Sequence, residues 1–140
     1  MISAMDISTS ALVAQRTRLN AIASNLANMS TTRDEDGQLK PYQARFVVFE
    51  TDQELTNRQG AAGVKVASVE TEQVEPLYKY QPNHPHAIQD GKWKGYVAYP
   101  NIDMTREFVD ALEATRSYEA NIGIMEITKS MSQQTLRIVG

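Results

Sequence analysis

The sequence contains no cysteine, which excludes disulfide bonds and thiolate chemistry. No apolar run approaches the length of about 18 residues that indicates a membrane span. The first residues lack the basic segment and continuous apolar run of a cleaved secretory signal, so none is expected. The net charge is only −3 and the positive charges are scattered, which is not the basic patch of a nucleic-acid-binding protein.

Proline is absent from both ends of the chain and glycine is almost absent, so both ends are predicted to be helical. From residue 103 to residue 139 there is one glycine, and apolar residues recur at alternating spacings of four and three. This spacing lays a stripe along one side of a helix about 55 Å long. Eight of the eleven stripe positions are apolar: Met104, Phe108, Ala111, Thr115, Tyr118, Ile122, Met125, Lys129, Ser132, Leu136 and Val139. A stripe of that length needs an equally long cover.

The N-terminal segment, residues 3–29, is the predicted cover. It has the same spacing of three and four, and Ser3 followed by Asp6 has the pattern of a helix start. Six of its eight stripe positions are apolar: Met5, Ser8, Leu12, Gln15, Leu19, Ile22, Leu26 and Met29. We therefore expect the two ends to pair as an antiparallel, coiled-coil-like bundle, with the middle of the chain as an excursion from one tip.

Asparagines gather at the end of the first helix, at Asn20, Asn25 and Asn28. Asparagine is a poor residue in the middle of a helix unless its amide is used. One interpretation places the three on a solvated face, where they fray the helix end. The other has them hydrogen-bond a partner helix and fix its register, as a buried asparagine can in coiled coils.

The middle of the chain is rich in β-forming residues. Residues 42–49, 64–69 and 74–80 are predicted strands of a small antiparallel sheet, which needs the helices or another subunit for support. Trp93, Tyr96 and Tyr99 either pack against this sheet or form an aromatic patch between subunits. The fold class is therefore α+β, with helical ends and a small antiparallel β central part.

No set of residues has the spacing of a catalytic or cofactor site. There is no glycine-rich phosphate loop and no nucleophile elbow. His84 and His86 are the only histidines and lack nearby carboxylate or cysteine support, so a metal site is not predicted. The sequence thus predicts no enzyme, no cofactor, no metal and no small-molecule substrate.

Several short motifs resemble those of the bacterial flagellar axial proteins. Asn25-Leu26-Ala27-Asn28 followed by Thr31-Thr32 is similar to their N-terminal signature, and residues 116–121 with 128–131 are similar to their C-terminal one. Within that family the chain most resembles the proximal rod subunits. That resemblance rests on an ordered set covering the whole chain: Pro41-Tyr42, Val47-Val48-Phe49, Gly63-Val64-Lys65-Val66, His84-Pro85 and residues 95–102.

The resemblance implies a structural subunit that polymerises helically into the rod, the drive shaft that crosses the periplasm. Such chains are exported unfolded through the flagellar type III apparatus, and their terminal helices form an inner tube. The implied division is residues 1–33 and 103–140 for the tube and 34–102 for an outward-facing domain. The implied subunit contacts are Leu12, Leu19, Ile22, Asn25, Leu26, Asn28, Phe108, Tyr118, Asn121, Ile122, Met125 and Leu136.

An alternative from another functional class is a soluble coiled-coil adaptor or chaperone that never polymerises. Polymerisation predicts apolar helix surface left over after the two helices pair. It also suggests a dilute monomer with unfolded ends and an ordered middle, residues 41–99, because isolated helices gain most of their stability from packing.

Overall fold

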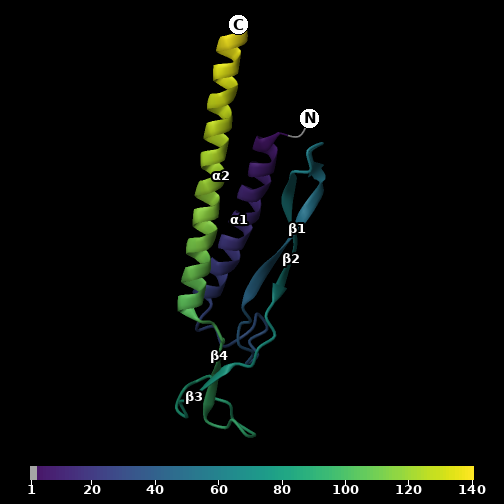
Figure 1. Cartoon of the computed structure of the whole chain (residues 1–140). Helices are drawn as coiled ribbons and strands as arrows, with labels where there is room; N and C mark the ends of the chain where they lie inside the picture. The colour runs from purple at the N-terminus through teal and green to yellow at the C-terminus, as the bar shows by residue number, and fades with distance from the viewer. Residues whose placement is uncertain (1–2) are drawn as a thin grey trace.

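A computed structural model describes residues 3–140 and confirms the α+β class (Figure 1). The two helices stand at the ends of the chain, and four strands lie between them. In chain order the elements are α1 (Ala4–Ala27), β1 (Arg45–Thr56), β2 (Ala62–Thr71), β3 (Leu77–Tyr80), β4 (Tyr96–Tyr99) and α2 (Met104–Val139).

Both helices begin where their capping residues predict. The Ser3 hydroxyl accepts a hydrogen bond from the backbone N–H of Asp6, and the Asp6 carboxylate accepts one from the Ser3 backbone N–H, which closes a capping box. Asp103 caps α2 by accepting from the backbone N–H groups of Thr105 and Arg106. These carboxylates satisfy N–H groups that a helix start would leave free.

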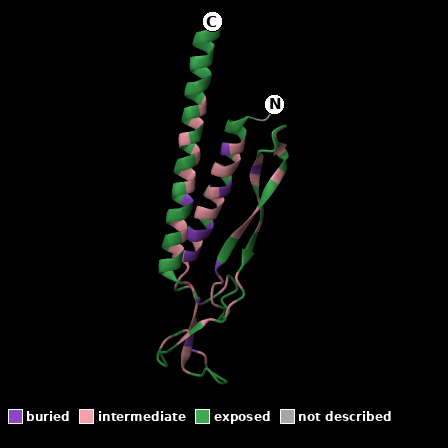
Figure 2. Cartoon of the chain, in the orientation of Figure 1, coloured by how far each residue is buried: buried purple, intermediate pink, exposed green. Residues whose placement is uncertain are grey.

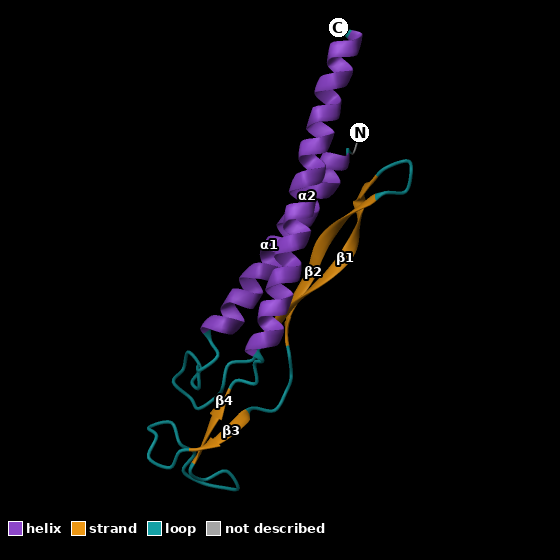
Figure 3. Ribbon diagram, turned by 60° about the vertical axis from the view of Figure 1, so that its left-hand side comes forward, coloured by secondary structure: helices purple, strands orange, loops and turns teal. Residues whose placement is uncertain are grey.

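The molecule is long and narrow, with α1 running antiparallel to α2 and lying between α2 and the hairpin of β1 and β2 (Figures 1 and 3). The pair β3 and β4 lies beyond the helices, at the end where α1 stops and α2 starts. We call residues 77–99, which contain β3, β4 and the loop between them, the tip module.

The predicted antiparallel β structure is confirmed, but its strands form two separate pairs, and the third predicted strand does not join the hairpin of the first two. β1 pairs with β2 in a long hairpin that contacts α1, and the acidic stretch after Phe49 extends this hairpin instead of forming a loop. The third predicted strand pairs instead with Tyr96–Tyr99. Pro76 stands directly before β3 and lacks the N–H that a central strand must donate, which favours a new pair over an addition to the hairpin.

The face that α2 turns toward α1 is not the predicted apolar stripe. Ala114 is the buried residue of α2, and its half-buried neighbours include Glu107, Ser117 and Asn121. Small side chains at a contact let two helices approach closely. The large apolar side chains of α2 lie mostly outside this contact. The predicted pairing of α1 with α2 is confirmed, but α1 covers only part of the predicted stripe. Ala111, Tyr118 and Met125 are half-buried as the stripe predicts, whereas Phe108 and Leu136 are exposed.

Burial is thin and divided between two places (Figure 2). On the helices and hairpin it involves mostly small residues, with Ala14, Ala21 and Ile22 on α1. In the tip module it centres on Val97 and Ala87. A chain with so little buried apolar area gains little stability from its own packing.

Candidate assembly site

Asn25 joins three elements through one buried side chain. Its Nδ2 donates to the backbone oxygen of Arg45, at the start of β1, over 2.8 Å, and to Oε2 of Glu107 on α2 over 3.2 Å. Its Oδ1 accepts from the Arg45 backbone N–H at 2.8 Å and from the Tyr42 hydroxyl at 3.1 Å. An asparagine amide has two N–H donors and two acceptor positions, so all are used. We call Asn25, Tyr42, Arg45 and Glu107 the junction.

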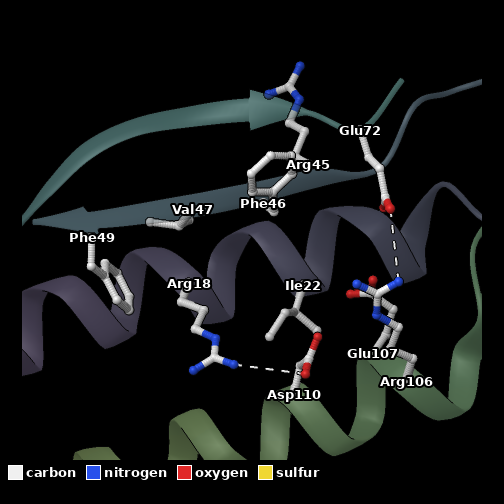
Figure 4. A pocket seen from close by; sticks show the side chains of 10 residues that line it. All are labelled: Arg18, Ile22, Arg45, Phe46, Val47, Phe49, Glu72, Arg106, Glu107 and Asp110. Atoms are coloured by element: carbon white, nitrogen blue, oxygen red, sulfur yellow. Dashed lines mark ion pairs between the residues drawn. The ribbon is translucent and has the colours of Figure 1, made fainter. Parts of the chain in front are cut away.

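An open cavity of about 260 Å³ adjoins the junction, between β1 and the first turns of α2 (Figure 4). Ile22 and three residues of β1, Phe46, Val47 and Phe49, line the cavity with apolar side chains, and charged side chains make up the rest. Arg18 lies 3.9 Å from Asp110 and Arg106 lies 3.9 Å from Glu72 in ion pairs. This mixture of screened charges holds neighbouring elements together and offers no convergent polar group for chemistry.

Partial burial raises the pKa of Glu107 above its ordinary value of 4.5. The nearby carboxylate of Asp110 raises this pKa further, while the amide of Asn25 donates to the charged form and lowers it. Burial has the largest effect on the pKa of Glu107, so the junction disfavours the charged form of this carboxylate.

Two exposed apolar surfaces lie on α2. The first, the outer face, occupies the start of the helix on the side away from α1 and consists of Met104, Phe108, Val109 and Leu112, which are 47% to 58% exposed. The second is the overhang, residues 129–139. The antiparallel register pairs Asn25 with Glu107 and Arg18 with Glu113, so α1 runs out near residue 128 of α2. Every residue of the overhang is exposed.

The predicted contact residues fall into three groups. Ile22 and Asn25 are buried within the chain, and Leu12, Leu19, Leu26, Asn28, Tyr118, Asn121 and Met125 are half-buried. Phe108, Ile122 and Leu136 are exposed, with Leu136 at 71%. Asn28 and Asn121 bond within their own helices, since each Nδ2 donates to a carbonyl oxygen four residues earlier. Asn25 alone of these three asparagines bonds to another element within residues 3–140.

Reasoning from the sequence missed the partners of these residues. Tyr42 and Glu107 bond to Asn25 in the junction. Tyr42 stands in the Pro41-Tyr42 motif, but its contact with Asn25 was not predicted, and no local pattern singles out Glu107. Thr32 was also missed: it is buried, and its Oγ1 lies 2.6 Å from Nδ1 of His86, which ties the loop after α1 to the tip module. Trp93 stacks on Tyr78 with ring centres 4.0 Å apart, so it packs on the β3–β4 pair.

Neither metal-binding clusters nor spanning helices occur in the described part of the chain. Among residues 3–140, no three histidine or acidic side chains come close enough to hold a metal ion. Over the same residues, no helix combines the length and apolar character needed to cross a bilayer.

Comparison with known proteins assigns the family. Residues 5–33 match the family model for the flagella basal body rod protein, and residues 94–138 match that for the flagellar basal body rod FlgEFG protein C-terminal region. The flagellar basal-body rod protein FlgC of Salmonella typhimurium is 43% identical over 138 residues, covering 99% of this chain and 97% of that protein. The chain belongs to the FlgC family of flagellar basal-body rod proteins. FlgC of Borreliella burgdorferi is 36% identical, over 99% of this chain and 97% of that protein. FlgC of Bacillus subtilis is 37% identical, over 96% of this chain and 95% of that protein.

Membership of the FlgC family makes the chain a structural component of the flagellar basal-body rod. The two matched family regions contain nearly all of α1 and of α2, and α2 carries the outer face and the overhang. The FlgC family is one of structural proteins, so the site to explain is a surface for assembly with other rod proteins.

Proposed function

We propose that this chain polymerises helically in the proximal part of the rod, through its terminal helices, and so builds the drive shaft. In this arrangement residues 1–33 and 103–140 form the inner tube, and residues 34–102 form the domain that faces outward. Its partners are copies of itself and other rod proteins, and it reaches the rod through the flagellar type III export apparatus.

The observation that supports polymerisation is the large apolar surface that α2 leaves uncovered. In the overhang, Met131 is 62% exposed, Leu136 71% and Ile138 85%. Apolar patches of this kind on a monomer mark protein interaction sites. A non-polymerising adaptor needs one such surface for one partner, whereas the outer face and the overhang lie at opposite ends of α2 and suit two neighbours.

A narrow, cysteine-free chain also suits export. Burial is thin and divided, so unfolding the molecule for passage through a channel costs little. The absence of cysteine prevents disulfides in a chain that passes from a reducing to an oxidising space.

The test introduces charge into the overhang with the variant Leu136→Glu/Ile138→Glu. Two carboxylates on a surface that becomes buried between subunits should abolish incorporation into the rod and motility. Electron microscopy of isolated basal bodies, with mass spectrometry of their proteins, measures incorporation, and far-UV circular dichroism of the purified variant checks helix content.

The matched control is Gln133→Glu/Gln134→Glu, which adds the same charge to the overhang at positions that are already polar. We expect this control to retain motility. Normal rods containing the Leu136→Glu/Ile138→Glu variant would contradict polymerisation through the overhang. A stable small oligomer of the wild-type chain in solution, with none in basal bodies, would favour the adaptor.

A further inference from the structure

The tip module presents aromatic side chains to solvent. Trp93 stacks on Tyr78 and meets Tyr96 edge to face, with ring centres 5.3 Å apart. These contacts fix the loop between β3 and β4 on the strand pair. Tyr80 remains 66% exposed and Trp93 36% exposed, so rigid aromatic surface is left for a partner.

The tip module contains three lysines, Lys79, Lys92 and Lys94, and two of them lie over aromatic rings. Lys92 lies with its ammonium 5.3 Å from the centre of the Trp93 ring, and Lys79 with its ammonium 5.2 Å from that of Tyr99. Asp90 is the single acidic residue of the tip module, which makes it basic within a chain of net charge −3. Within residues 3–140 none of the module's lysines forms an ion pair. Lys79 lies over Tyr99 on the opposite face of the β3–β4 pair from Tyr80 and Trp93. We therefore define the basic-aromatic surface by Tyr80, Lys92, Trp93 and Lys94.

A cluster of opposite charge lies in the loop that follows α1, at Asp34, Glu35 and Asp36. The Asp34 side chain shapes the loop, because its Oδ1 accepts from the backbone N–H groups of Asp36 and Gln38. The side chains of Glu35 and Asp36 are exposed and form no ion pair in the described chain. We call residues 34–36 the acidic loop.

Both surfaces lie at the same end of the molecule. The contact between Thr32 and His86 holds the start of this loop against the tip module, beyond the end of α1 (Figures 1 and 3). In copies placed side by side at one level of a rod, the acidic loop of one copy and the basic-aromatic surface of the next would therefore lie at the same height. Two different patches meeting in this way make a heterologous contact, which propagates around a helical assembly.

We infer that the basic-aromatic surface binds the acidic loop of a second copy of this chain. The inference rests on the proposed polymerisation and adds a lateral contact to it. Complementary charge fixes the register of neighbours and rejects wrong ones, since like charges placed together repel. The exposed aromatic rings supply apolar contact area around the ion pairs.

The experiment reverses each surface separately. One variant is Glu35→Lys/Asp36→Lys and the other is Lys92→Glu/Lys94→Glu, each produced in cells without the wild-type chain. Each reversal places like charges at every lateral contact, so we expect about tenfold fewer copies of either variant in isolated basal bodies. Co-expression of both variants should restore incorporation, because each then finds a complementary neighbour.

The control is Glu54→Lys/Glu70→Lys, which changes net charge as the first variant does but on the hairpin. It should incorporate normally. Full incorporation of either reversed variant by itself overturns the inference. Failure of co-expression to restore incorporation also overturns the inference, because the basic-aromatic surface then contacts its own molecule or a different protein. If the wild-type chain is itself missing from the rod, the proposed function fails instead.

Discussion

Asn25 shows how one side chain can hold an elongated molecule together. It lies at the only place where α1, the start of β1 and α2 meet through hydrogen bonds within residues 3–140. The sequence around Asn25 left open whether its side chain is solvated or bonds to another helix, and in the structure it bonds to Glu107 of α2. Asn25 differs from Asn28 and Asn121 in its partners, which lie 20 and 82 residues away in the sequence. No local sequence pattern therefore identifies them.

The first prediction is that Asn25→Ala destabilises the folded chain. Removing this amide leaves the partly buried backbone N–H and carbonyl oxygen of Arg45 without their partner, which should lower the free energy of unfolding by about 1–3 kcal/mol. Urea titration followed by circular dichroism measures this loss.

Asn121→Ala is the control, because Asn121 bonds within its own helix and alanine is the better helix former. It should leave the free energy of unfolding unchanged or slightly higher. Equal losses for the two variants would show that Asn25 has no special role.

The second prediction concerns pH and Glu107. Its folded pKa is raised above 4.5, so between the two values the folded chain binds the proton more tightly than the unfolded chain. The contribution of Glu107 to stability is therefore greatest below pH 4.5 and falls as pH rises through the folded pKa. Glu107→Gln lacks this titration but keeps an acceptor for Asn25.

The measurement compares urea unfolding of wild type and Glu107→Gln from below pH 4.5 to neutral pH. The free energy of the variant relative to wild type should rise across this range. The two proteins share all the other charged residues near Glu107, so the comparison removes this one carboxylate: Arg18, Arg45, Glu72, Arg106 and Asp110 are present in both. If the free energy of unfolding of the variant relative to wild type falls as pH rises, the pKa of Glu107 is lowered and not raised in the folded chain.

At the scale of elements, the hairpin is seated on α1 through a close approach at Gly63. A Cβ at this position would lie 2.9 Å from Oγ of Ser10 and 3.0 Å from Cβ of Leu55. The Ser10 hydroxyl cannot simply turn away, because it accepts from the Val64 backbone N–H and donates to the Ile7 oxygen. Glycine is therefore the residue that lets the strand lie this close to the helix.

The third prediction follows from this contact. Gly63→Ala should push β2 away from α1 and lower the free energy of unfolding by about 1–3 kcal/mol, the usual cost of overpacking. Gly123→Ala is a matched control on α2, where a Cβ meets nothing within 4 Å. In that helix interior alanine should stabilise by about 0.5–1 kcal/mol. Thermal unfolding of both variants distinguishes them, and a stabilising Gly63→Ala would mean that the hairpin is loosely seated.

The elements themselves could largely be predicted from the sequence. Both helices, their caps and the β character of the middle follow from local signals such as Ser3 with Asp6. Strand pairing was not predicted: Pro76 argues against adding β3 to the hairpin, but nothing local to β3 identifies β4 as its partner. The buried face of α2 could not be predicted either, because the buried residue of α2 is the small Ala114 and not one of its larger apolar residues.

The same limit applies to the assembly site. The motifs around Asn25 and residues 116–121 pointed to the family, and the apolar repeat pointed to α2 as a contact helix. Which of those apolar residues remain available to a neighbour depends on how far α1 reaches, and only the three-dimensional register shows that it stops short of the overhang.

At the scale of the whole molecule, the overhang is the part least protected by the chain itself. Its residues have no neighbour on the α1 side, and an uncovered helical end of about three turns is marginal in water. The loss of α1 would also uncover the hairpin, which packs on α1, so an ordered middle without the helices would be restricted to the tip module.

The fourth prediction is that limited proteolysis of the dilute monomer removes residues 129–139 before it cuts α1. Mass spectrometry of the fragments over time gives the order. The same digestion of isolated basal bodies should leave the overhang intact, because neighbouring subunits cover it there. Protection of the overhang in the dilute monomer would mean that it is covered without polymerisation.

The antiparallel arrangement of α1 and α2 also sets an order of events in folding. Asn25 and Glu107 are 82 residues apart in the chain, so closing that loop costs about 4 kcal/mol of chain entropy before the contact forms. The hairpin closes over a much shorter loop and can rest on α1 first. We therefore expect α2, the helix with the two exposed apolar surfaces, to dock last. If the proposed polymerisation uses these surfaces on docked α2, a chain still leaving the ribosome or the export channel could not polymerise too early.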